Sequence, residues 1–476
     1  MRAALAPERR FGLALLAIGL VAGIQGVAYA PFAGPRLGDS PTYIAPAHAL
    51  RHGSYTTPLP RVDVTALRIP RGAVGKPERQ SYRTPAYPLV VAATGGGETR
   101  EATHALIALQ AVLTGLAAIL LTLAARRLWG ARLALLAGAL VALDPWPKHY
   151  VPRVLSEALA GFLVAVSAYA FVHAWQERSL PWWAGFGLAT GALALARPLF
   201  VLVVPLAVLA ALLWSAPARR RLVTVVAYLA GALVLLGPWV AWEADVDGRA
   251  TLSSFGEGWN LLIAAHGEGR GRSAVDVQND PAYLRDFDSV HRFAPSERRL
   301  ATDPEAHPHY LARADSEQRR LAWDLYGRRL RDEPLTVLGE VAYRASFLWL
   351  AHTDWVQPAS VRPLLAALDW TTLALALGGI MLALRAGGAG RALGLFLLVF
   401  TLVNALHHVE ARYAMPVRGV YLSFAALALA ALAARLARRH EGRQQQRGDP
   451  DARRGEVAHG RQVRLGQPEH DPRAED

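Results

Sequence analysis

Long uninterrupted runs of alanine, leucine and valine limit how this chain can fold more than any other feature of its sequence. Each run is about 15–22 residues long, and about 20 apolar residues in an α-helix cross the hydrocarbon core of a bilayer. The mean hydropathy of the 476 residues is +0.20, and 19% are charged, below the roughly 25% of soluble domains. These values exclude a disordered chain and an ordinary soluble enzyme, and they predict an all-α polytopic membrane protein.

The runs predict about ten transmembrane helices. They cover residues 11–31, 103–124, 132–145, 156–175, 182–196, 198–214, 222–242, 364–384, 391–407 and 414–436. The first run follows Arg2, Arg9 and Arg10 and also fits a secretory signal peptide, because small residues at 28–30 resemble a cleavage site. The many later runs favour an uncleaved first helix. The chain has no cysteine, which excludes structural disulfides, Fe–S clusters and thiol catalysis.

Arginine in the short loops indicates how the helices are oriented. The formal net charge is +13, and short cytoplasmic loops of membrane proteins are enriched in basic residues. With the N-terminus in the cytoplasm, every arginine-rich short loop falls on that side. These loops contain Arg126, Arg127, Arg132, Arg178, Arg219, Arg220, Arg221, Arg385 and Arg391, and the tail follows Arg435. Topology therefore explains most of the positive charge, and we expect no nucleic-acid partner.

This orientation divides the chain into six parts. They are the cytoplasmic N-terminus and first helix (1–31), a first extracytoplasmic loop (32–102), transmembrane helices 2–7 (103–242), a second extracytoplasmic loop (243–363), the C-terminal transmembrane helices (364–436) and a disordered cytoplasmic tail (437–476). The tail is predicted from its polar composition. The first loop is basic, which is either ordinary for a long loop or a sign of an anionic ligand.

The stretch 336–352 is apolar enough to be considered as a further span. However, it carries Glu340 and Arg344 in its middle, and counting it as a span would place the later arginine-rich loops outside. We therefore expect an amphipathic helix on the extracytoplasmic surface.

Two carboxylates stand at the expected extracytoplasmic ends of helices. Asp39 precedes a predicted helix that begins near Pro41, so it either caps that helix or acts as a general base or metal ligand. Glu157 follows Ser156 at the start of the fourth predicted span. It either interacts with the helix dipole or belongs to an active site, because a carboxylate deep in a bilayer is costly.

Three arginines are predicted at the same face. Arg83 precedes two prolines that restrict the chain to an extended turn, Arg197 interrupts two apolar runs, and Arg412 lies in the last extracytoplasmic turn. A guanidinium group can bind phosphate through two parallel hydrogen bonds. The alternative is interfacial anchoring, in which the side chain reaches the water.

The last extracytoplasmic turn also contains His407, His408 and Glu410. Adjacent histidines near a glutamate are weak candidates for a metal site, and an internal Glu410–Arg412 ion pair with interfacial histidines is the commoner outcome. The sequence leaves the cofactor unknown, with a divalent metal as one possibility.

Five short motifs, in this order and at one predicted face, carry a resemblance to a known group of proteins. They contain Asp39, Tyr43 and Ala47; Arg83, Pro85, Tyr87 and Pro88; Ser156 and Glu157; Arg197 and Pro198; and Glu410, Arg412, Tyr413 and Pro416. Over residues 11–436 the chain resembles the GT-C superfamily of polyprenyl-phosphate-sugar glycosyltransferases, in particular the protein O-mannosyltransferase and lipid A aminoarabinose transferase group. Many relatives have two adjacent acids in the first loop, whereas Gly38 and Ser40 flank Asp39 here, which leaves metal dependence open.

The resemblance implies a glycosyltransferase of the bacterial plasma membrane with its active site on the extracytoplasmic face. Its partners would be a polyprenyl-phosphate-linked sugar donor, a glycan, lipid or protein acceptor, and the bilayer. The roles implied are catalysis for Asp39 and Glu157, donor phosphate binding for Arg83, Arg197 and Arg412, and substrate binding for Tyr43, Tyr87 and Tyr413. An alternative is a non-enzymatic flippase or transporter of a lipid-linked anion, and a third is a scaffold or receptor.

Overall fold

The computed structural model describes residues 2–30, 39–53, 55, 83–96, 99–213, 216–247, 249–253, 256–269, 272–291, 306–353 and 360–448. Every regular element in these ranges is helical, apart from one isolated bridge between Gly269 and Arg272. The predicted all-α fold is therefore confirmed. Most of the basic residues of the first predicted loop lie outside the described residues.

A helix covers each predicted apolar run, although the helices differ in length. In the described part of the chain, seven helices are long and apolar enough to cross a membrane. They belong to α1 (Arg2–Ala28), α5 (Arg100–Trp129), α8 (Glu157–Glu177), α11 (Ala218–Asp247), α18 (Arg362–Ala386), α19 (Gly388–Ala405) and α20 (Arg418–Gly448). Three shorter apolar helices account for the other runs, namely α6 (Ala131–Leu143), α9 (Leu180–Ala196) and α10 (Val203–Leu213), the last preceded by the 3-10 turn η3 (Pro198–Leu202).

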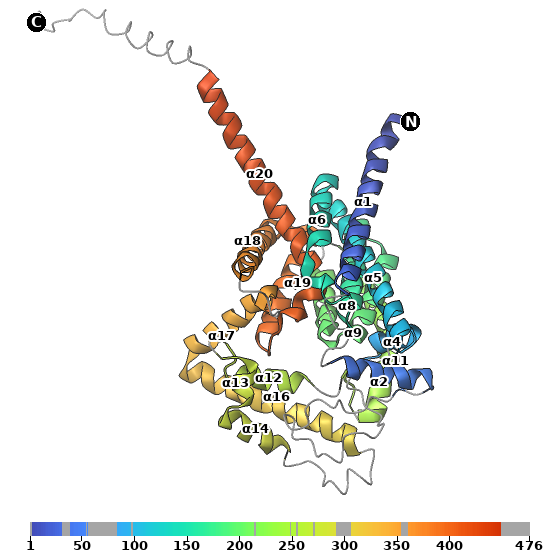
Figure 1. Ribbon diagram of the computed structural model, residues 1–476, viewed down its shortest axis with the longest axis vertical. Helices are drawn as coiled ribbons and strands as arrows, with labels where there is room; N and C mark the ends of the chain where they lie inside the picture. The colour runs from blue at the N-terminus through green and yellow to red at the C-terminus, as the bar shows by residue number, and fades with distance from the viewer. Residues whose placement is uncertain are drawn as a thin grey trace, which may run out of the picture. The chain divides into compact units, whose positions relative to one another are not determined.

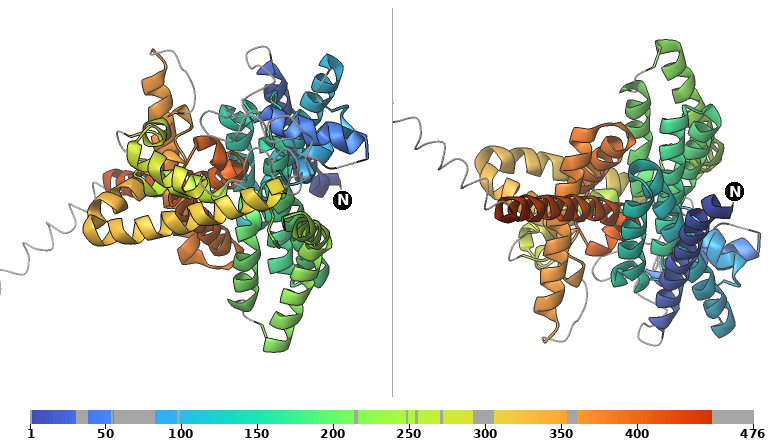
Figure 2. Two further views of the ribbon diagram at one scale, coloured as in Figure 1. Left: turned by 90° about the horizontal axis from the view of Figure 1, so that it is seen from below. Right: turned by 90° about the horizontal axis from the view of Figure 1, so that it is seen from above.

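The remaining helices belong to the two long connecting segments and to short turns. The first segment contains α2 (Ser40–Arg51) and α4 (Ala86–Ala93); the second contains α12 (Glu257–Ala265), α13 (Ala274–Gln278), α14 (Pro281–His291), α16 (Ala306–Asp332), α17 (Pro334–Phe347) and η4 (Ala351–Thr353); the turns are α7 (Pro145–Lys148) and η5 (Ala411–Val417). Figure 1 shows α2, α4, α12 and α16 at the end of the helix bundle away from the N-terminus. Seen from that end, α16 crosses the bundle (Figure 2).

Small residues allow α9 and α11 to pack closely in the bundle. A Cβ atom on Gly187 would lie 2.0 Å from the carbonyl oxygen of Tyr228, and one on Gly231 would lie 2.1 Å from that of Ala184. No larger residue fits there without moving a helix. Glycine at such crossings lets two backbones approach closely, which is how helices commonly associate in membranes.

Helix α17 covers most of the stretch 336–352, and it is not among the helices able to cross a membrane. Its two charged residues attach it to neighbouring helices. Glu340 forms an ion pair of 2.7 Å with Arg329 of α16, and Arg344, only 1% exposed, donates to the carbonyl oxygen of Ala405 at 2.7 Å. The two charged residues that argue against a transmembrane span therefore bind α17 to neighbouring helices.

The chain divides into two compact units, Met1–Leu427 and Ala428–Asp476. In the second unit, helix α20 continues to Gly448, past residue 437, where the tail was predicted to begin. Arginine, glutamine and glutamate favour helices, which explains why the polar composition did not end this one. Residues 449–476 lie outside the described part of the chain.

A buried ion cluster joins three apolar helices near the start of α20. The Nε atom of Arg418 lies 2.7 Å from Oδ2 of Asp144, and its Nη2 atom lies 3.2 Å from Oδ1 of Asp369. Asp369 also accepts hydrogen bonds of 2.9 Å from the backbone and the ring of His352. All three charged side chains of Arg418, Asp144 and Asp369 are at most 6% exposed.

We expect Arg418→Met to destabilise the protein by about 3–5 kcal/mol, because removal of one partner leaves buried charges uncompensated. The measurement is thermal unfolding in detergent. Arg438→Met, in the exposed part of α20, is the matched control and should leave Tm unchanged. Combining Arg418→Met with Asp144→Asn and Asp369→Asn should recover part of the loss; if Arg418→Met alone left Tm unchanged, the cluster would not be an ion pair.

Candidate functional site

Asp39 lies between two guanidinium groups that come from distant parts of the sequence. Its Oδ1 atom lies 3.3 Å from Nη2 of Arg83, and its Oδ2 atom lies 2.8 Å from Nη1 of Arg412. Asp39 occupies the N-cap position of α2, but its side chain makes no capping hydrogen bond. The capping alternative therefore does not account for this carboxylate.

Arg83 is held on several sides and does not extend freely into solvent. Its Nε atom donates to Oγ1 of Thr42 at 2.8 Å, its guanidinium group lies 4.5 Å from the ring centre of Tyr43, and its carbonyl oxygen accepts a hydrogen bond from the hydroxyl group of Tyr55. The Thr42 hydroxyl in turn donates to the carbonyl oxygen of Asp39 at 2.6 Å. These contacts fix Arg83 beside Asp39 and disfavour simple interfacial anchoring.

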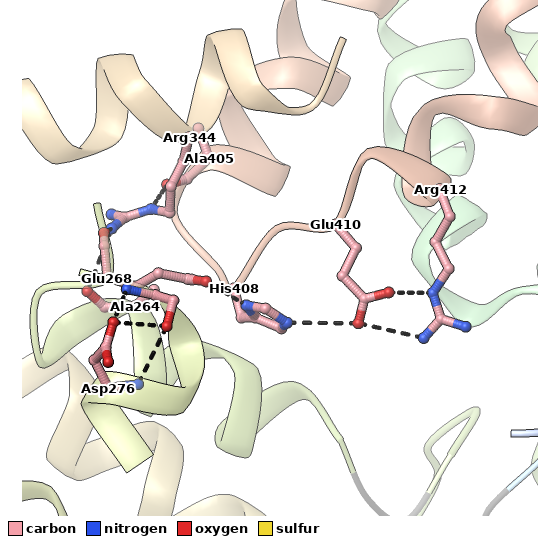
Figure 3. Close-up of polar contacts among 9 residues, drawn as sticks. Ala264, Glu268, Asp276, Arg344, Ala405, His408, Glu410 and Arg412 are labelled. Carbon is pink, nitrogen blue, oxygen red and sulfur yellow. Dashed lines mark hydrogen bonds and ion pairs between the residues drawn. The ribbon is translucent and has the colours of Figure 1, made fainter. Parts of the chain in front are cut away.

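Arg412 belongs to the short turn η5, where it faces two carboxylates. Besides Asp39, it contacts Glu410 through Nε and also through Nη2, which donates to Oε1 at 3.4 Å. Figure 3 shows Glu410 between Arg412 and His408, whose Nε2 atom lies 3.6 Å from Oε1 of Glu410. The internal Glu410–Arg412 pair expected from the sequence is present, but it extends to Asp39 and His408.

Glu157 and Arg197 form a second, more buried pair. Oε1 of Glu157 lies 3.3 Å from Nη1 of Arg197, with side-chain exposures of 4% and 15%. Oε2 of Glu157 is buried and has no hydrogen-bond partner among the residues that the structure describes. The ring of Tyr413 links the two pairs, because its centre lies 5.6 Å from the Arg197 guanidinium carbon and 5.7 Å from that of Arg412.

The two other predicted tyrosines lie one behind the other. The Tyr43 hydroxyl lies 3.3 Å from Oγ of Ser156, and Tyr87 packs edge-on against the Tyr43 ring at 4.9 Å. Tyr87 is fully buried and donates to Oε1 of Gln110 at 2.9 Å. Tyr87 therefore supports Tyr43 from behind, so that any effect of Tyr87 on a substrate would be indirect.

The structure thus gathers Asp39, Arg83, Glu157, Arg197 and Arg412 in one place, together with Tyr43, Tyr413, His408 and Glu410. We call the first five residues the candidate site. The sequence predicted that these five residues share a membrane face, but it did not predict the contacts between them. Glu157 begins α8 and Arg197 follows the last residue of α9. Asp39 and Arg83 belong to the first connecting segment, and Arg412 belongs to the last turn before α20.

Electrostatic interactions keep the groups around Asp39 charged near neutral pH. Burial would raise the pKa of Asp39, but the Arg83 and Arg412 guanidinium groups outweigh burial and lower this pKa below its ordinary value. Burial would also raise the pKa of Glu410, but Arg412 and His408 lower it to about 2. Burial lowers the pKa of His408, whereas hydrogen bonds to Glu268 and Glu410 raise it to about 9.

The predicted metal candidates take part in other contacts. The Nδ1 atom of His407 lies 2.8 Å from the carbonyl oxygen of Val403 in its own helix, whereas His408 and Glu410 contact Glu268 and Arg412. Within the described ranges, no group of three His, Asp or Glu side chains is placed to hold a metal ion. A divalent metal stays a prediction.

Two residues near the site were not predicted. Arg153 lies close enough to Glu157 and Arg412 for their charges to act on it, and it contacts His149; its position before Ser156 on the arginine-poor face was an available signal. Glu268, which contacts His408 at 2.6 Å, lies in the second connecting segment, where no motif distinguishes it from other acidic residues.

Comparison with known proteins places this geometry in context. Residues 99–242, which contain Glu157 and Arg197, match the family model of dolichyl-phosphate-mannose-protein mannosyltransferases. No curated protein matches the chain by sequence. Together with a likeness of fold to solved structures, this match confirms the resemblance to the GT-C superfamily.

Several solved structures are similar to the chain. The oligosaccharyltransferase of Archaeoglobus fulgidus in complex with Zn and sulfate is 13% identical over 88% of this chain and 49% of that chain, with a TM-score of 0.52. The same enzyme tethered with an acceptor peptide containing the NVT sequon is 14% identical over 89% of this chain and 50% of that chain, with a TM-score of 0.50. ArnT from Cupriavidus metallidurans bound to undecaprenyl phosphate is 17% identical over 87% of this chain and 76% of that chain, with a TM-score of 0.35.

At these identities the likeness to the oligosaccharyltransferase is a likeness of fold. The chain spans about half the length of that enzyme.

Proposed function

We propose that this chain is a membrane glycosyltransferase that moves a sugar from a polyprenyl-phosphate donor to an acceptor at the extracytoplasmic face. The observation that carries the proposal is the position of Asp39 between Arg83 and Arg412, next to the buried Glu157–Arg197 pair. The match of residues 99–242 to dolichyl-phosphate-mannose-protein mannosyltransferases supports a lipid-phosphate donor.

The arginines are suited to a lipid phosphate. Arg83 and Arg412 both contact Asp39. A phosphate group that enters between these two arginines can take the place of the Asp39 carboxylate and accept hydrogen bonds from both guanidinium groups. Arg197, whose guanidinium carbon lies 5.6 Å from the centre of the Tyr413 ring, supplies a third guanidinium group. Neutralisation of the phosphate charge makes it a better leaving group without a separate general acid.

The same contacts suggest how donor binding activates Asp39. While both arginines contact it, the lowered pKa of Asp39 makes it a weak base. A phosphate that takes over these arginines removes their stabilisation of the carboxylate, so the pKa of Asp39 rises. Asp39 is then better suited to accept a proton from an acceptor hydroxyl group.

The reaction that follows from this arrangement is a single displacement. The acceptor oxygen attacks the anomeric carbon, its proton passes to Asp39, and the bond from that carbon to the phosphate oxygen breaks through an oxocarbenium-like transition state. Attack opposite the leaving phosphate inverts the anomeric centre. Glu157, whose Oε2 atom has no hydrogen-bond partner in the described part of the chain, would orient the acceptor hydroxyl group or a metal ion.

The arrangement of the helices supports a hydrocarbon-linked substrate. An apolar cavity between α8, α9, α10 and α19 is lined by Phe171, Leu193, Ala207 and Phe396, and it can receive part of a lipid chain. The connecting segments that carry the site lie at the bundle end away from the N-terminus (Figure 1), which agrees with the sidedness predicted from the arginine distribution.

The test is incubation of the purified protein with radiolabelled polyprenyl-phosphate sugars and a membrane extract. We expect label to move from at least one donor to an acceptor in the extract. A parallel reaction without protein is the control. If no donor gave labelled product while the protein carried the same donors across liposome bilayers, the chain would be a transporter. Transporter sites usually lie near the middle of the membrane, whereas the charged residues of the candidate site gather at one end of the bundle.

A further inference from the structure

A row of alternating charges joins the second connecting segment to the candidate site (Figure 3). It begins at Glu268, whose Oε1 atom lies 2.6 Å from Nδ1 of His408. The other ring nitrogen of His408 lies 3.6 Å from Glu410, which pairs with Arg412. Arg412 in turn contacts Asp39 at 2.8 Å. The row therefore runs from the residues after α12 to the residue that precedes α2.

Backbone contacts fix the chain at the start of this row. The backbone N–H of His408 donates to the carbonyl oxygen of Asn260 in α12 at 2.9 Å. The Tyr326 hydroxyl of α16 donates to the carbonyl oxygen of Leu406 at 2.9 Å. The buried Arg344 of α17 donates to the carbonyl oxygens of Ala405 and Glu268. Three helices of the second segment thus hold His408 and the residues just before it.

Charge makes His408 the central member of the row. It is the cation placed between Glu268 and Glu410, and only an imidazole ring with both nitrogens protonated presents an N–H group to each of two carboxylates. If His408 were neutral or absent, Glu268, which is 10% exposed, would lose its ion-pair partner. Glu410 would then be held from one side only, by Arg412, and the orientation of Arg412 toward Asp39 would be less restricted.

We propose that His408 is a positioning residue, through which helices α12–α17 hold Glu410 and Arg412 in the arrangement that binds and activates the donor phosphate. This inference rests on the proposed function. It gives the second connecting segment an effect on the reaction through His408, Glu410 and Arg412, although that segment contributes none of the five residues of the candidate site.

The test compares single, double and exchanged variants of the pair. We expect His408→Gln and Glu268→Gln each to lower kcat about 10–100-fold, the range for loss of a charge-assisted hydrogen bond. The double variant should be no worse than either single variant, because both changes remove the same contact. Effects that add, or a His408→Gln variant with full kcat, would overturn the proposal.

The exchanged variant, Glu268→His with His408→Glu, separates positioning from simple attachment. It rebuilds a His–carboxylate pair but places a second carboxylate beside Glu410, so kcat should stay low. Full recovery of kcat would mean that the pair only attaches the second segment, which would contradict the proposal. The control is His266→Gln, which removes a comparable contact of 3.1 Å with Asp286 among the same helices and should leave kcat unchanged.

Hydrogen exchange provides a measurement that does not depend on turnover. Backbone amides of residues 408–413 should exchange faster in His408→Gln and Glu268→Gln than in the unchanged protein and in His266→Gln. Equal exchange in all four proteins would overturn the positioning role. If the purified protein transferred no sugar from any donor, the proposed function would fail separately, and the exchange rates would still decide whether His408 holds the turn.

Discussion

Asp39→Asn should reduce sugar transfer by about 10²–10⁴-fold, the usual contribution of a general base, while donor binding becomes tighter. The amide cannot accept the acceptor proton, so the rate falls. It also carries no negative charge, so it no longer competes with the donor phosphate for Arg83 and Arg412. The measurements are kcat and the Kd for the polyprenyl-phosphate donor in detergent.

Asp324→Asn is the matched control for this prediction. Asp324 also pairs with an arginine, Arg320, at 3.3 Å, but both side chains are more than half exposed on α16. We expect this variant to keep both kcat and donor affinity. A folded Asp39→Asn protein with full transfer activity would show that another group takes the proton, with Glu157 the next residue to test.

The opposite signs of the two effects distinguish the proposed roles of Asp39. If this carboxylate only bound a metal ion or only held the two arginines in place, its neutralisation would weaken donor binding along with the rate. Competition between Asp39 and phosphate predicts tighter binding and slower chemistry in the same variant. The close contacts of Asp39 with both guanidinium groups are the reason to expect competition.

Most of the candidate site could be predicted because charge is costly in an apolar chain. Glu157 and Arg197 interrupt or border runs of alanine and leucine, where an ionised side chain needs a partner. The arginines of the short loops indicated orientation independently, and that orientation assigned these residues to one face. The fold class followed from the same runs, although α6 is only 13 residues long, because its run ends at Asp144 and Pro145.

The contacts between residues could not be predicted in the same way. Glu268 lies in a segment rich in charged residues, where one more glutamate carries no signal. Its partner His408 is 140 positions away, and nothing local in the sequence relates the two. Arg418 and Asp369 similarly form a buried pair between helices that are far apart in sequence, and each alone suggests only the end of an apolar run.

Arg412→Gln should lower kcat/KM for the donor by about 10²–10³-fold, the effect of removing one donor that stabilises developing negative charge. Two carboxylates, Asp39 and Glu410, face this guanidinium group. Without it they repel each other and any incoming phosphate, so both binding and chemistry are impaired. Steady-state kinetics with a range of donor concentrations would separate KM from kcat.

Arg412→Lys should recover only part of this loss. Lysine keeps the positive charge, but it lacks the planar group that contacts Asp39 through Nη1 and Glu410 through Nε and Nη2. Arg272→Gln is the control, because Arg272 pairs with Asp280 within the second segment and lies outside the row that ends at Asp39. Equal activity of Arg412→Gln and the unchanged protein would exclude Arg412 from the phosphate site, and the donor would then be bound by Arg83 and Arg197 alone.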